Sequence, residues 1–105
     1  MLRIYDVMLD AIEVARPLLR AIAAHDRDLA NRLTRATQSV PLNIAEGSGS
    51  SGGARMARYR TALGSARETV AAIQVAERFG YVGPIPQPFT TRVNQVIGTL
   101  VRVTQ

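Results

Sequence analysis

The chain has 105 residues, 47% of them apolar, and a formal net charge of +5. This length fits one domain, residues 1–105, and the apolar content excludes a disordered tail. The absence of cysteine excludes a disulfide scaffold and a cysteine-based zinc site. No charge-free apolar run is long enough to span a membrane. We therefore expect a cytoplasmic protein without a membrane segment.

The positive charge is placed unevenly along the chain. All 13 basic residues are arginine, and they balance the acids in residues 1–25 and again in residues 26–51. Residues 52–105 hold seven arginines against Glu68 and Glu77, which accounts for the whole excess. Such an asymmetry points to an anionic partner.

The first expected element is a helix from Leu2 to about Ala24, where apolar residues recur every three or four positions. Pro17 lies in its interior and should kink it, because proline removes one backbone hydrogen bond. The alternative is two shorter helices. His25 is the only histidine, and with no second histidine or cysteine to share a metal we interpret it as an exposed turn residue. Asp26 is the expected N-cap of the next helix.

The second expected helix continues to Glu46, with Gly47 as the glycine just beyond its C-terminus. Residues 47–53, all glycine or serine, then predict a flexible loop. A glycine-rich loop can cradle phosphate, but this one lacks the Lys-Ser/Thr that follows in a P-loop, and no strand precedes it. We interpret it as a linker.

The third expected helix spans residues 54–79 and is closed by Gly80, with apolar residues in a heptad-like pattern. Three prolines make residues 81–88 a stiff connection, and a fourth helix runs from Phe89 to the C-terminus. Its wide apolar face should contact neighbours on two sides. Four such helices without a strand signal predict an all-α, antiparallel up-and-down four-helix bundle.

Two segments carry a family resemblance: Arg35-Ala36, Ser39 and the run from Pro41 to Gly47, and later the run from Ala62 to Glu68. Over roughly residues 2–104 the chain resembles the 23S rRNA intervening-sequence proteins, a four-helix bundle family. Its members are similar to the accessory protein of diversity-generating retroelements, a pentameric ring that binds a reverse transcriptase and nucleic acid. The resemblance implies a homo-oligomeric ring, a pentamer, with a basic surface. The partners it implies are further copies of the chain, RNA or DNA, and a reverse transcriptase or another protein.

One departure from the family pattern concerns the basic surface. Family members usually carry an arginine or lysine just after the Asn-Ile-Ala-Glu-Gly motif, where this chain has Ser48-Gly49-Ser50-Ser51. The resemblance then implies one lost nucleic-acid contact, for which Arg55, Arg58 and Arg60 are the expected replacements.

A polar stripe lies beside the apolar one on the second helix. Its members Arg35, Ser39, Asn43 and Glu46 are expected to face Ser65 and Glu68 on the third helix, with Arg35 as counter-charge to the two carboxylates. One interpretation is a structural network that fixes helix register. The other is an acid/base site built from Glu46 and Glu68, although no nucleophile or metal-ligand set accompanies them.

Arg55, Arg58 and Arg60 crowd the first two turns of the third helix without an acid among them. Basic charge there opposes the helix dipole, which favours an anionic partner, and Tyr59 could stack on a base. With Arg67 these residues are the candidate nucleic-acid contacts. The alternative is a solvated face balanced by acids from elsewhere.

We therefore expect a non-enzymatic, homo-oligomeric accessory protein that binds the RNA or DNA backbone without base specificity, and that has neither a cofactor nor catalytic or metal-binding residues. The alternative is a protein–protein adaptor or assembly module in which the charge serves a protein partner or solubility.

Overall fold

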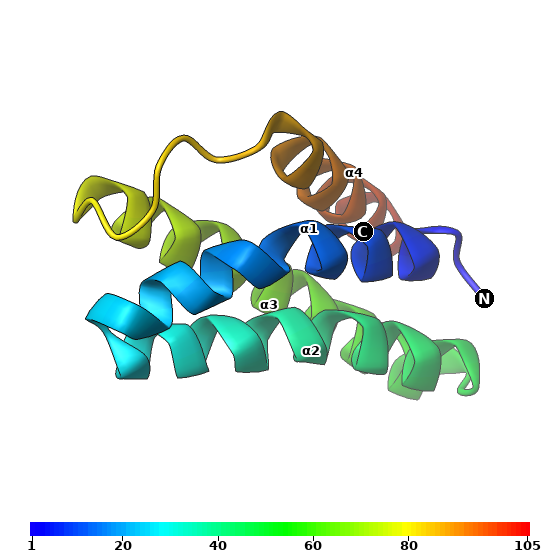
Figure 1. Cartoon of the computed structure of the whole chain (residues 1–105). Coiled ribbons are helices and arrows are strands. Elements are labelled where there is room, and N and C mark those ends of the chain that lie inside the picture. Colours follow the sequence, from blue (N-terminus) through cyan, green and yellow to red (C-terminus); the bar gives the residue numbers. More distant parts are fainter.

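The computed structural model describes all 105 residues as four α-helices without a strand. They are α1 (Ile4–His25), α2 (Arg27–Ser48), α3 (Gly52–Arg78) and α4 (Gln87–Val103). The helices pack side by side, with successive helices reversing direction at short connections, and the molecule measures 42 × 24 × 20 Å (Figure 1). The predicted all-α fold class is confirmed.

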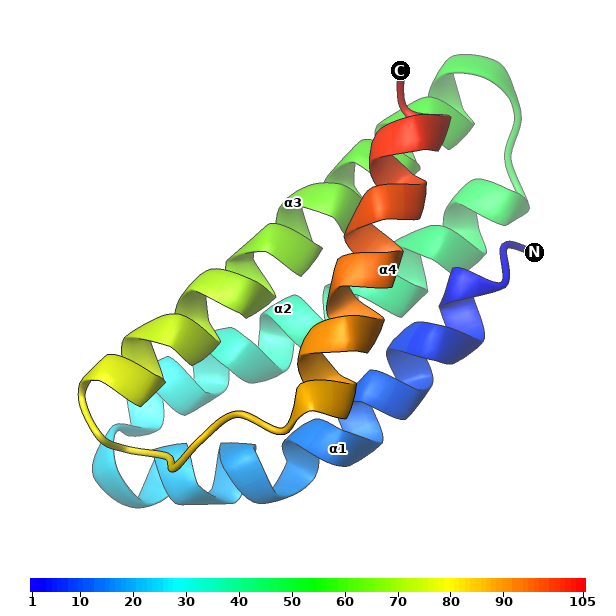
Figure 2. The ribbon, with the colours of Figure 1, turned by 90° about the horizontal axis from the view of Figure 1, so that it is seen from above.

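Helix α1 buries one continuous stripe, as the sequence pattern predicts: Ile4, Met8, Ala11, Ala15, Leu18 and Ile22. Pro17 lies inside the helix on its exposed side. The ribbon of α1 changes direction partway along its length (Figure 2). The structure therefore has one bent helix rather than two shorter ones.

A single residue, Asp26, connects α1 to α2. Its backbone N–H donates to the carbonyl of Ile22 at 2.7 Å, and its side-chain Oδ1 accepts from the Leu29 N–H at 3.0 Å. The side chain satisfies one of the free N–H groups at the start of α2, so the predicted N-cap is confirmed.

The predicted end of the second helix is wrong. Gly47 lies inside α2, which continues to Ser48, and only residues 49–51 separate α2 from α3. Gly47 serves close packing instead, because a Cβ built on it would lie 2.5 Å from Cε1 of Tyr59. Gly47 stands at the end of the apolar pattern, but it faces a ring of the next helix and does not terminate α2.

Helix α3 ends at Arg78, one residue before the predicted Phe79, and Gly80 closes it as predicted, because its φ of 75° is the left-handed conformation that glycine favours. Its N–H donates to the Glu77 carbonyl at 3.0 Å, and the Tyr81 N–H donates to the Ala76 carbonyl at 2.9 Å. This pair of bonds is a Schellman motif, which fixes the direction of the chain as it leaves the helix.

Helix α4 follows a connection of residues 79–86 and carries Pro88 in its first turn, where proline is tolerated. Its apolar stripe was expected at Phe89, Val93, Val96, Leu100 and Val103; the first four are buried and Val103 is partly exposed. The helix packs against both α1 and α3, as the width of its apolar face predicted. The most extensive interface of the molecule is between α2 and α3.

Candidate nucleic-acid interface

The predicted polar network exists in its central part, across the interface of α2 and α3. The Ser65 hydroxyl donates to Ser39 Oγ at 2.7 Å. On α2 itself, Asn43 Nδ2 donates to the Ser39 carbonyl at 2.8 Å and to Ser39 Oγ at 3.0 Å. All three residues are half-buried. Their hydrogen bonds tie one turn of α2 to one position on α3, which supports the structural interpretation of the network.

The two carboxylates do not meet, contrary to the predicted pairing. Glu46 lies 3.0 Å from Arg58, and Glu68 lies 3.8 Å from Arg32. All four side chains are about half or more exposed to solvent. Water therefore solvates both carboxylates, and neither needs a buried counter-charge. An acid/base site built from Glu46 and Glu68 has no support in this geometry.

Arg35 is not the counter-charge of either acid. Its side chain is exposed and makes no ion pair or side-chain hydrogen bond. It lines a shallow hollow with Arg32, Ser39, Ser65 and Glu68. The acids pair instead with arginines that the network prediction did not include, because helix rotation and side-chain reach decide the partner.

Two of the candidate arginines are engaged within the chain. Arg55 Nε donates to the Gly47 carbonyl at 3.1 Å, and its Nη2 donates to the Ser48 carbonyl at 3.4 Å. These carbonyls end α2, where a cation is favourable because of the helix dipole. Arg58 is the partner of Glu46. Both arginines therefore have a structural function that the sequence pattern did not reveal.

Tyr59 is not available for stacking on a base. Only 7% of the residue is exposed, because its ring packs against Gly47. Its hydroxyl lies 3.3 Å from Ser48 Oγ. The residue is a core contact between α2 and α3, and the prediction of a stacking platform at this position is wrong.

Arg60 and Arg67 remain as candidate contacts. Both are exposed and make no ion pair or side-chain hydrogen bond. They lie on the outer face of α3, which we define by its exposed positions at helical spacing: Gly53, Ala57, Arg60, Gly64, Arg67, Ala71, Gln74 and Arg78. This face contains no acidic residue and adds Arg78, also exposed and unpaired, to the candidates. The sequence carries a signal for Arg78, because it follows Arg67 by eleven residues, or about three helical turns, and so lies in line with it on one face.

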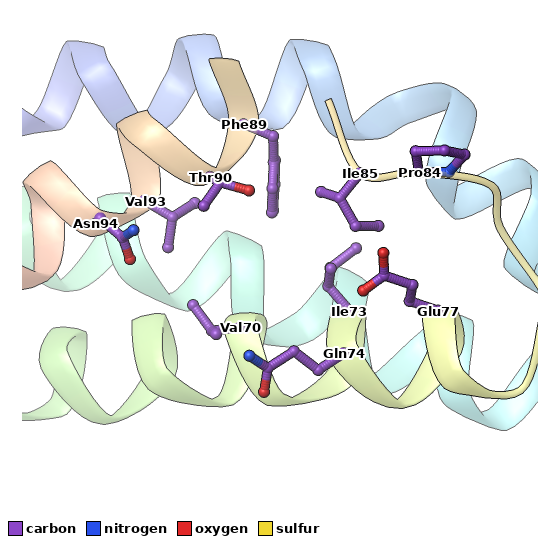
Figure 3. A pocket seen from close by; sticks show the side chains of 10 residues that line it. All are labelled: Val70, Ile73, Gln74, Glu77, Pro84, Ile85, Phe89, Thr90, Val93 and Asn94. Carbon is purple, nitrogen blue, oxygen red and sulfur yellow. The ribbon is translucent and has the colours of Figure 1, made fainter. Parts of the chain in front are cut away.

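The side chains between α3, the connection that follows it and α4 enclose a separate cavity of about 340 Å³ (Figure 3). Val70 and Ile73 of α3 face Phe89 and Val93 of α4 across it. Glu77 is the one ionisable side chain in its lining. The cavity shares Gln74 with the outer face of α3, but its one ionisable group is a carboxylate, which repels a phosphate, so we do not include it in the candidate interface.

No group of three or more histidine, cysteine, aspartate or glutamate side chains is close enough to hold a metal ion. None of the four helices combines the length and the apolar character that crossing a membrane requires.

The model of the 23S rRNA-intervening sequence protein family matches residues 4–100, nearly the entire chain. The chain belongs to this family. Neither a curated protein nor a solved structure matches it significantly.

Four of the residues that carry the family resemblance serve the α2–α3 interface or support it. Asn43 bonds Ser39, Glu46 pairs with Arg58, and Gly47 accommodates the Tyr59 ring. From the later segment, Ser65 bonds Ser39. These motif residues thus mark how two helices pack, whereas Gly64 and Arg67 of the later segment lie on the outer face of α3.

Proposed function

We propose that this family member is a non-enzymatic accessory protein that binds the backbone of RNA or DNA through the outer face of α3. The observation that carries the proposal is the set of exposed, unpaired arginines Arg60, Arg67 and Arg78 on a face without acid. At about 1.5 Å per residue, Arg60 and Arg67 are separated by about 10 Å along the helix. Cations aligned in this way attract a polyanion without reading its sequence.

We further propose that the protein acts as a homo-oligomeric ring in the cytoplasm. The pentamer, and a reverse transcriptase or other protein as an additional partner, are proposed from the resemblance to the retroelement accessory protein alone. A pentamer would carry five times the formal +5 of one chain. Such a field extends over a Debye length of about 8 Å at physiological salt and would accelerate encounter with a polyanion.

The test is a titration of labelled single- and double-stranded RNA and DNA at several salt concentrations. A variant with Arg60, Arg67 and Arg78 replaced by glutamine should reduce the salt slope on single strands by about 2 for each protomer in contact, because each phosphate contact contributes about 0.7. The matched control replaces Arg3, Arg20 and Arg27, which are also exposed and unpaired, and removes the same charge elsewhere.

If the salt slope of binding falls equally in the two triple variants, only the net charge matters and the outer face of α3 is not the site. Absence of binding by the wild-type protein even at low salt would contradict nucleic-acid binding altogether. It would favour the alternative, a protein–protein adaptor, for which the exposed Leu42 and Phe79 side chains offer apolar contacts.

A further inference from the structure

Helices α1 and α3 both terminate at the same end of the molecule (Figure 1). Three aromatic rings, those of His25, Phe79 and Tyr81, stack there. The ring centroid of Tyr81 lies 5.2 Å from that of His25 and 5.4 Å from that of Phe79. The ring planes are nearly parallel, with angles of 8° and 15°. His25, expected only as an exposed turn residue, is thus the last residue of α1 and part of this stack.

Phe79 presents its ring to solvent from a hydrogen-bonded helix end. The residue is 69% exposed, although burial of such a ring is favourable. The Phe79 N–H donates to the Val75 carbonyl at 3.0 Å, and the Schellman motif at Gly80 follows directly. Tyr81, which packs against the hydrophobic core, holds the ring from one side. An exposed aromatic ring with a fixed orientation is an efficient binding surface, because little side-chain freedom is lost on contact.

Beside this ring lies a surface hollow of about 460 Å³ that we call the Phe79 hollow. It is lined by Ala71, Gln74, Val75, Arg78 and Phe79. The lining combines apolar side chains with one cation and one amide, and it has no acid. A flat heterocycle with an attached phosphate matches this chemistry: the ring stacks on Phe79, and Arg78 faces the phosphate.

The Phe79 hollow also continues the outer face of α3, with which it shares Ala71, Gln74 and Arg78. We propose that it stacks an unpaired base of single-stranded RNA or DNA whose backbone follows Arg60 and Arg67. The inference rests on the proposed function and specifies its substrate class. A single strand is required because the bases of a duplex are already stacked on their neighbours, whereas aromatic platforms accept an unpaired base of any identity.

The first experiment replaces Phe79 by alanine and measures binding of single-stranded RNA, single-stranded DNA and a duplex of the same sequence. The affinity for single strands should fall at least about fivefold, with an unchanged salt slope and unchanged duplex affinity. Leu42→Ala is the matched control, because Leu42 is 64% exposed on α2 and lies outside the hollow. Circular dichroism should give Phe79→Ala a melting temperature close to that of the wild type.

The second experiment uses the absence of tryptophan from the chain. In Phe79→Trp the new indole is the only one, and stacking of a base should quench its fluorescence on addition of single-stranded RNA. Leu42→Trp should show no quenching. Unquenched fluorescence at saturating RNA, or Phe79→Ala binding as tightly as the wild type, would overturn this inference. If the triple arginine variant nevertheless shows the reduced salt slope, the proposed function stands and only the stacking inference fails. Absence of all binding would contradict both.

Discussion

Gly47 and Tyr59 bring α2 and α3 closer together than a residue with a Cβ at position 47 would allow. A Cβ at position 47 would lie only 2.5 Å from Cε1 and 2.7 Å from Cδ1 of the Tyr59 ring. The glycine is fully helical and needs no unusual backbone conformation, since its φ is not positive. Glycine is therefore needed at position 47 because there is no room for a side chain. Gly80 differs, because its positive φ closes α3.

This difference can be tested with two glycines inside helices. Gly47→Ala should lower the free energy of unfolding by about 1–3 kcal/mol, because the added methyl group forces the Tyr59 ring to move. Gly64→Ala is the control, since nothing lies within 4 Å of its Cβ position. It should stabilise by about 0.5–1 kcal/mol through helix propensity. Urea denaturation measures both free energies of unfolding. If Gly47→Ala stabilised the protein as much as Gly64→Ala, the Tyr59 ring would have moved aside without strain.

At the scale of elements, α2 and α3 are joined by a row of polar contacts of unequal strength. The half-buried hydrogen bond between Ser39 and Ser65 lies between two exposed ion pairs. Exposed ion pairs contribute little because water screens them and their long side chains lose freedom. We therefore assign register between the helices to the serines and to the apolar contacts around them.

The corresponding prediction compares neutral variants along this row. Glu46→Gln and Glu68→Gln should each change the free energy of unfolding by at most about 1 kcal/mol, and should leave the protein folded. Ser65→Ala should cost about 0.5–1.5 kcal/mol despite its smaller chemical change. Thermal and urea unfolding measure these changes in the free energy of unfolding. Unfolding of either glutamine variant would indicate that the carboxylates are buried in an assembly of several copies.

At the scale of the whole molecule, the arginine excess of residues 52–105 does not all reach solvent as free charge. Arg55 and Arg58 are engaged by α2, whereas Arg60, Arg67 and Arg78 are free on the outer face of α3. Arg92 and Arg102 hydrogen-bond within α4, so the arginines of this half that make no ion pair or side-chain hydrogen bond all lie along α3. A ring of several copies would multiply this face, which is how a chain of 105 residues could engage a long polyanion.

The proposed assembly predicts a solution mass that is a multiple of the 11.4 kDa chain, with the pentamer as the expected species. Light scattering after size exclusion, in buffers of low and high salt, measures it directly. The nucleic acid should be absent from the sample, because a polyanion could itself collect monomers. A monomer across the concentration range would contradict both the ring and its multivalent surface.

The sequence by itself determined the four helices and the faces they bury. Periodic apolar residues, the Asp26 cap and the glycine at position 80 are local signals, and each is confirmed. The stripe of α1 kept its phase across Pro17, so even its bend was predictable. These features depend on residues within one or two turns of each other, where spacing alone fixes geometry.

Only the tertiary structure decided which polar groups meet and which stay free. The chain order of Gly47, Arg58 and Tyr59 suggested a terminator, a phosphate contact and a stacking ring; in the fold they become a packing site, an ion-pair partner and a core residue. Conversely, the stack of His25, Tyr81 and Phe79 joins the end of α1 to the end of α3, so it depends on how these two helices pack. Exposure and pairing depend on neighbours from other helices, and those neighbours are set by packing rather than by spacing along the chain.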